Sequence, residues 1–112
     1  MAPYLIDLNH EEFWVIYLSR ANRIMKKERI SKGGISGTIV DSKLIMKKAL
    51  LLLASSIVLV HNHPSGNRNP SEQDKNVTEK IKSACKLLEI NLIDHIIIAG
   101  NSYYSFADEL IL

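Results

Sequence analysis

The sequence feature that most constrains the fold is a short apolar run that ends in two histidines. The run Ser56–Val60 has the composition of a buried strand, and His61 and His63 follow it. Side chains two residues apart on a strand lie on the same face, about 7 Å apart along the backbone, so both imidazoles can approach one point. A turn rich in proline and glycine follows, and from Ser71 onward apolar residues recur at helical spacing. The pattern predicts a strand, a loop and a helix.

Asp74 lies in the first turn of this predicted helix and can face back toward the two histidines. Two neutral imidazoles and one carboxylate form a ligand set suited to a divalent metal, above all zinc, with a fourth position left for water. Two other interpretations stay open. A histidine at a strand end is often a hydrogen-bonded surface residue, and Ser71–Asp74 fits a capping box that would use Asp74 only to start the helix. The joint spacing, H-x-H followed after seven residues by S-x-x-D, favours the metal site.

The same residues carry a resemblance to a known family. The pattern H-x-H-x7-S-x-x-D, with Pro64 directly after the second histidine, is similar to the zinc site of the JAB/MPN (JAMM) metallohydrolases. Within them, H-N-H-P-S-G, P-S-x-x-D and L-L-E-I-N-L-I-D-H-I-I-I-A-G resemble the C-terminal domain of bacterial RadC, a family named for DNA repair. The resemblance runs from about residue 11 to residue 106. It implies a JAB/MPN-like, cytidine-deaminase-like fold in which His61, His63 and Asp74 bind one zinc ion or another divalent metal.

The resemblance also implies catalytic residues. In the family, a glutamate at the mouth of the first strand holds the metal-bound water, and the stretch E-F-W-V-I-Y-L places Glu12 in that role. Glu11 is the adjacent competitor, because strand alternation aims only one of the two inward and the sequence does not set the register by one residue. We favour Glu12, which directly precedes the strand. Ser71 is expected to donate to the oxyanion of a tetrahedral intermediate, and helix capping by its hydroxyl is the competing interpretation.

The remaining patterns predict one α/β domain over residues 1–112. The expected elements are strands at 13–18 and 24–30, a helix at 43–54, the strand at 56–60, a helix after Ser71, and strands at 94–99 and 102–106. Gly33, Gly34 and Gly37 predict a flexible connection between the second strand and the first helix. This order predicts a single layered domain in which helices flank one mixed, curved β-sheet.

Composition narrows the class of protein further. The hydrophobic share of 46% and the charged share of 23% are ordinary globular values. No apolar run reaches the roughly 18 residues of a membrane span, and the first residues lack the basic and apolar regions of a signal peptide, so we expect a cytoplasmic location. The lone Cys85 excludes an internal disulfide and a cysteine-rich zinc ribbon.

Taken together, these features predict a zinc-dependent hydrolase of the metallopeptidase or isopeptidase type, which attacks a peptide or protein substrate with metal-activated water. A nucleobase deaminase would need H-x-E and P-C-x-x-C, which the chain lacks. In HNH nucleases the three residues of the motif are spread along a hairpin and a helix. The consecutive residues His61, Asn62 and His63 therefore match that name only by chance. A non-catalytic DNA- or protein-binding module stays open, because Lys26, Lys27 and Arg29 make the predicted hairpin basic. The helical N-terminal region usual in RadC chains is not seen in this sequence.

Overall fold

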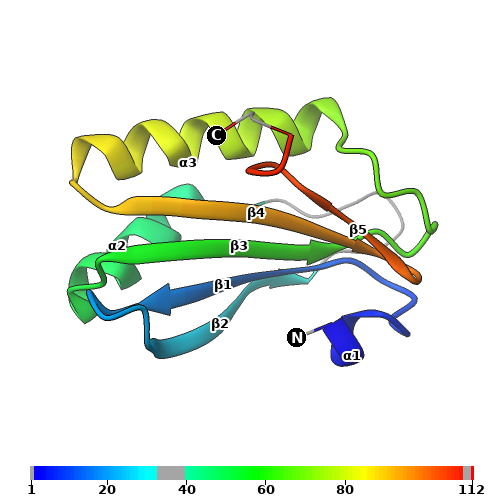
Figure 1. The fold of residues 1–112 in the computed structure, drawn as a ribbon, viewed down its shortest axis with the longest axis horizontal. Coiled ribbons are helices and arrows are strands. Elements are labelled where there is room, and N and C mark those ends of the chain that lie inside the picture. Colours follow the sequence, from blue (N-terminus) through cyan, green and yellow to red (C-terminus); the bar gives the residue numbers. More distant parts are fainter. Residues whose placement is uncertain (1, 33–39, 110–111) are drawn as a thin grey trace.

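Five strands form one mixed sheet in the computed structural model, which describes residues 2–32, 40–109 and 112 (Figure 1). The helices and strands are α1 (Ala2–Leu5), β1 (Glu12–Leu18), β2 (Ile24–Lys32), α2 (Ser42–Leu52), β3 (Ser56–Asn62), α3 (Glu72–Leu87), β4 (Asn91–Ala99) and β5 (Ser102–Ser105). The strand order is β2-β1-β3-β4-β5. Only β3 and β4 pair in parallel, and the other neighbours are antiparallel. The predicted α/β fold with a mixed sheet is confirmed.

Several element boundaries differ from those expected from the sequence; β3 continues to Asn62 beyond the expected end at residue 60, and β4 begins at Asn91 and not at residue 94. The second strand continues to Lys32, beyond the expected end at residue 30, because Ser31 and Lys32 still pair with the start of β1. The short helix α1 was not expected, since its four residues show no helical periodicity. The expected flexible connection at Gly33, Gly34 and Gly37 lies outside the described residues.

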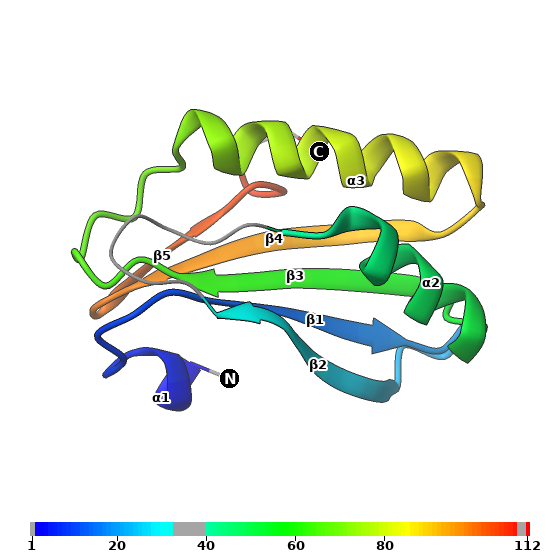
Figure 2. The ribbon, with the colours of Figure 1, turned by 180° about the vertical axis from the view of Figure 1, so that it is seen from behind.

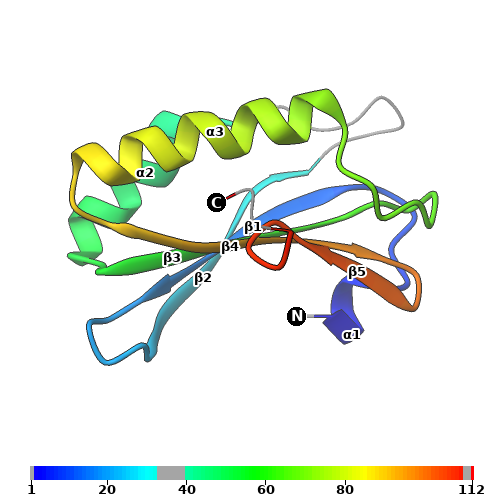
Figure 3. The same cartoon turned by 45° about the horizontal axis from the view of Figure 1, so that its top comes forward.

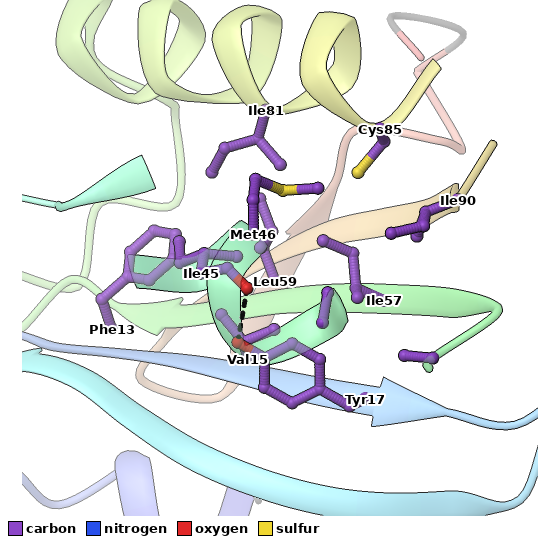
Figure 4. Packing of buried hydrophobic residues seen from close by; sticks show 12 residues of the cluster. Phe13, Val15, Tyr17, Ile45, Met46, Ile57, Leu59, Ile81, Cys85 and Ile90 are labelled. Atoms are coloured by element: carbon purple, nitrogen blue, oxygen red, sulfur yellow. Dashed lines mark hydrogen bonds between the residues drawn. The ribbon is translucent and has the colours of Figure 1, made fainter. Parts of the chain in front are cut away.

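The two long helices cover one face of the sheet, and α1 lies against the other (Figures 2 and 3). The main core lies between the sheet and these helices, where alternate residues of the central strands meet α2 and α3 (Figure 4). Its fully buried members include Val15, Tyr17, Ile45, Ala49, Ile57, Leu59 and Ile81. The Tyr17 hydroxyl donates to the Ile45 carbonyl over 3.0 Å, so this buried polar group is satisfied.

The opposite face of the sheet carries the other set of alternate residues. Leu5 of α1 packs there against Val60 of β3 and Ile98 of β4. In β1 and β3 the odd-numbered residues therefore face the long helices and the even-numbered residues face α1. This parity decides where the two neighbouring glutamates point. Among the described residues, no helix combines the length and apolar character that crossing a lipid bilayer requires.

Candidate metal centre

The three expected metal ligands meet where the C-terminal end of β3 faces the N-terminal end of α3, on the right in Figure 1. The Nε2 atoms of His61 and His63 lie 3.1 Å apart. One carboxylate oxygen of Asp74 lies 3.3 Å from Nε2 of His61, and the other lies 3.0 Å from Nε2 of His63. His61 is buried, while His63 and Asp74 are half-buried. The spacing in the sequence is thus matched by convergence in space.

The glutamate beside these histidines is Glu11. Its Oε1 lies 3.8 Å from Nε2 of His63, and ligand atoms of Glu11, His61 and His63 all lie within 4.8 Å of one another. Because Phe13 pairs with His61 across β1 and β3, Glu11 shares the face of the odd-numbered residues. The catalytic role of either glutamate stays a prediction, but the position favours Glu11, the competing candidate, over Glu12.

Glu12 lies on the other face, in a cluster of its own. Its carboxylate lies 2.8 Å from Nε2 of His10, accepts from Trp14 Nε1 over 3.0 Å and from the Tyr4 hydroxyl over 3.3 Å, and lies 3.6 Å from the Arg29 guanidinium. Burial raises the pKa of Glu12, but the hydrogen bonds with His10, Trp14 and Tyr4 outweigh it and leave the pKa lowered. Glu12 is therefore held as an ionised structural carboxylate.

Asp74 takes part in the metal-site cluster and in helix capping at once. The Ser71 side chain accepts from the Asp74 N–H over 3.0 Å, and Asp74 Oδ2 accepts from the Ser71 N–H over 2.8 Å, which completes a capping box. The two interpretations of S-x-x-D are thus compatible. Burial raises the pKa of Asp74, whereas a proton on His61 or His63 that faces the carboxylate, together with the Ser71 N–H, holds the pKa far below its usual range. The structure places Ser71 at the N-cap and exposed.

The donor set fits a divalent cation. Nδ1 of His63 lies 2.8 Å from the Asn67 carbonyl, which can only accept, so Nδ1 carries a proton and Nε2 of the neutral ring presents a lone pair. The hydrogen bond with Asp74 raises the pKa of His63, and burial opposes that rise. Two imidazole nitrogens and carboxylate oxygens are ligands that zinc accepts.

Asn62, between the two histidines, ties the Glu11 backbone to β3. Its Oδ1 accepts from the Glu12 N–H over 2.8 Å, and its Nδ2 donates to the His10 carbonyl over 2.9 Å. The two bonds are made by the residues on either side of Glu11. They extend the antiparallel hydrogen bonding between β1 and β3 by one more pair. The buried amide of Asn62 therefore fixes where Glu11 stands relative to His63.

Two buried polar residues lie behind the site, and the sequence suggested a possible supporting role for only one of them, His95. His95 on β4 is fully buried and Thr78 on α3 is 2% exposed. Burial and the neighbouring His61 lower the pKa of His95 well below its ordinary value. From the sequence, His95 could support the metal site, although a satisfied polar residue at a strand end was the favoured interpretation. Thr78 is one of many polar residues on a helix, and only the packing of α3 on β4 shows its position.

Comparison with known proteins shows similarity over nearly the whole chain. A family model described as the RadC-like JAB domain matches residues 1–111. A UPF0758 protein of Flavobacterium johnsoniae is 50% identical over 109 residues, which cover 97% of this chain and 48% of that protein. The UPF0758 protein YfjY of Escherichia coli is 39% identical over 108 residues, 96% of this chain and 68% of that protein.

A UPF0758 protein of Porphyromonas gingivalis is 48% identical over 113 residues, which cover the whole of this chain and 50% of that protein. The chain therefore spans about half the length of the first curated relatives that it matches. The names of these relatives state no activity.

Proposed function

The chain belongs to the family of RadC-like JAB domains, and from this premise we propose that it is a zinc-dependent hydrolase of the metallopeptidase or isopeptidase type. The observation that carries the proposal is that the Nε2 atoms of His61 and His63 lie 3.1 Å apart, with Asp74 within 3.3 Å of both and Glu11 3.8 Å from Nε2 of His63. A structural zinc site is normally closed by four protein ligands, whereas a catalytic site keeps a position for water. Three protein ligands, His61, His63 and Asp74, with Glu11 nearby as a base, fit a catalytic zinc site better than a structural one.

His61, His63 and Asp74 would hold one zinc ion or another divalent metal. The bound ion would supply a Lewis acid that lowers the pKa of a water molecule from about 15.7 to about 7. Glu11 would take the proton of the attacking water and return it to the leaving amine, as a half-buried carboxylate next to His63 can do. The positive end of the α3 dipole would favour the Asp74 carboxylate and the negative charge that develops beside it.

Ser71 is proposed as a donor to the oxyanion. The cap uses a lone pair of its oxygen to accept the Asp74 N–H, and this bond does not consume the hydroxyl proton. Exposure of Ser71 at the start of α3 leaves room for a substrate carbonyl beside it.

The proposed substrate is a peptide or protein. A polar pocket of about 320 Å³ lies between the loop that follows His63 and the edge strand β5, with Arg68 and Tyr103 in its lining. Arg68 donates from Nη1 to the Tyr103 carbonyl over 3.0 Å and so joins the metal-site loop to the edge of the sheet. Asp108 and Glu109 also line the pocket, and the proposed metal ligands and base do not. We also propose that the protein is cytoplasmic, as expected from its sequence.

The decisive experiment combines zinc titration with peptide hydrolysis. Purified metal-free protein is titrated with zinc by calorimetry, and turnover is measured on a mixture of internally quenched peptides. His61→Ala should lose zinc binding. Glu11→Gln should keep zinc binding and lose about 10²- to 10⁴-fold in rate. Glu12→Gln is the matched control and should keep both, and a fully active Glu11→Gln protein would exclude the proposed mechanism.

A second candidate is a non-catalytic module that binds DNA or a repair protein. The observation in its favour is the basic edge strand β2, on which Lys26, Lys27 and Arg29 are exposed. Phosphate contacts of this kind weaken steeply as salt rises. A salt-dependent mobility shift of duplex DNA, lost when the three residues are changed to alanine, would support this candidate. No shift at low salt would remove the DNA-binding form of it.

A further inference from the structure

A chain of buried hydrogen bonds runs behind the proposed metal ligands. Nδ1 of His61 lies 2.8 Å from Nε2 of His95. Nδ1 of His95 lies 2.5 Å from the Thr78 hydroxyl oxygen. The Thr78 hydroxyl in turn lies 2.8 Å from the backbone carbonyl of Asp74. The chain therefore begins at one proposed ligand and ends at the backbone of another.

The carbonyl at the end of this chain sets the direction of every proton in it. A carbonyl oxygen can only accept, so the Thr78 hydroxyl must donate to Asp74. The single hydroxyl proton is then used, and Thr78 accepts from Nδ1–H of His95. A neutral His95 ring carries one N–H, so its Nε2 is an acceptor and takes the proton of His61 Nδ1. His61 is left with a bare Nε2, which is the atom that faces His63 and Asp74.

Two aromatic rings hold this arrangement in place. Phe13 stacks on His61 with ring centroids 5.4 Å apart, and Phe106 stacks on His95 with centroids 4.7 Å apart. Both histidines are nearly or fully buried, so rotation of either ring would disturb packing on two sides. The hydrogen bonds choose the tautomer, and the packing keeps the rings in the plane that those bonds require.

We propose that His95 and Thr78 are positioning residues that fix His61 in the tautomer with its proton on Nδ1, so that Nε2 is available to a metal before any metal arrives. In this state the 3.3 Å contact between His61 Nε2 and Asp74 joins two acceptors, which a cation relieves. The inference rests on the proposed function in taking His61 as a metal ligand. The tautomer itself is a property of the metal-free protein.

The test is therefore made first without metal. Long-range nitrogen–proton NMR of the metal-free wild-type protein should show His61 protonated on Nδ1. In Thr78→Val, His95 loses the acceptor for its Nδ1–H, and Nε2-protonated His61 should appear. Zinc affinity, measured by competition with a chelating dye, should fall about 10- to 100-fold. Thr78→Ser is the matched control, because it restores the hydroxyl and should restore both the tautomer and the affinity.

The rival arrangement has all protons reversed, with Thr78 donating to His95 and His61 Nε2–H donating to Asp74. Nε2-protonated His61 in the wild-type spectrum would overturn the inference without the use of any variant. A Thr78→Val protein with an unchanged His61 tautomer would also overturn it. The Nδ1-protonated form together with no zinc binding would leave the inference standing and reject the proposed function, so the two can fail separately.

Discussion

Glu11 and Glu12 are neighbours in the chain, but their side chains serve different ends. Glu11 is half-buried beside His63, where a carboxylate can exchange protons with water. Glu12 is 1% exposed and held by donors from His10, Trp14 and Tyr4. A single step along a strand thus separates the proposed base from a carboxylate that stabilises the fold.

Glu12 should make stability depend on acidity. Its pKa is lowered in the folded protein, so its contribution is present above its ordinary value of about 4.5 and is lost as pH falls through the folded pKa. Glu12→Gln should therefore be less stable than wild type at pH 7, and the difference should shrink below pH 4.5. Urea unfolding at several pH values measures this.

The control for that series is Glu79→Gln, which changes an exposed glutamate on α3. Its unfolding free energy should stay parallel to that of the wild-type protein across the same pH range. A Glu12→Gln protein whose deficit is constant with pH would show that the carboxylate charge is not what stabilises this cluster.

At the scale of elements, the first turn of α3 joins stability to metal binding. The capping box that starts the helix also orients the Asp74 carboxylate toward His61 and His63. Ser71→Ala should cost about 0.5–2 kcal/mol of unfolding free energy and should also weaken zinc binding, because the Asp74 N–H loses its Ser71 Oγ acceptor and the turn that carries the Asp74 carboxylate is held less firmly. Chemical denaturation and zinc calorimetry measure the two effects.

The other long helix provides the matched comparison for Ser71→Ala. Asp41 caps α2 by accepting from the Lys43 and Leu44 N–H groups, far in sequence from the metal ligands. Asp41→Ala should cost a similar amount of stability and leave zinc affinity unchanged. Equal loss of zinc affinity in both variants would mean that the Ser71 effect reflects general destabilisation.

The junction of β1 and β3 depends on the Asn62 amide. Asn62→Ala leaves the Glu12 N–H and the His10 carbonyl without their side-chain partner, and each buried unsatisfied group costs about 1–3 kcal/mol. Hydrolysis should fall more than zinc affinity, because Glu11 and not the ligand set loses its anchor. Parallel denaturation, hydrolysis and calorimetry test this, with the exposed Asn76→Ala as control. Equal losses of rate and affinity would contradict it.

At the scale of the whole molecule, zinc should stabilise the fold by mass action. A ligand that binds only the folded state at about 100 times its Kd adds about 2.7 kcal/mol. Zinc should therefore raise the Tm of the wild-type protein, a chelator should reverse the rise, and His61→Ala should not respond. Differential scanning calorimetry measures the shift, and an equal rise in His61→Ala would place the zinc elsewhere.

Much of this architecture was predictable because its signals are local. The run before His61 and the helical spacing after Ser71 predicted β3 and α3, and the joint spacing predicted the convergence with Asp74. The choice between Glu11 and Glu12 was not predictable, since β1 is apolar on both faces and alternation gives no polar side to anchor the register. The pairing of Phe13 with His61 determines which residues of β1 face the histidines. This pairing joins residues far apart in the sequence, so local patterns do not reveal it.

From the same contrast in range we expect an order in which the parts of the centre come together during folding. His63 and Asp74 are separated by 11 residues, so a short loop closure brings them together. The bond from Glu12 to Asn62, which anchors the proposed base, spans 50 residues and requires β1 to have joined β3. Under the proposed function, the folding chain would hold an ion before its base is in place, so its own unfolded segments would not be cut before the sheet has closed.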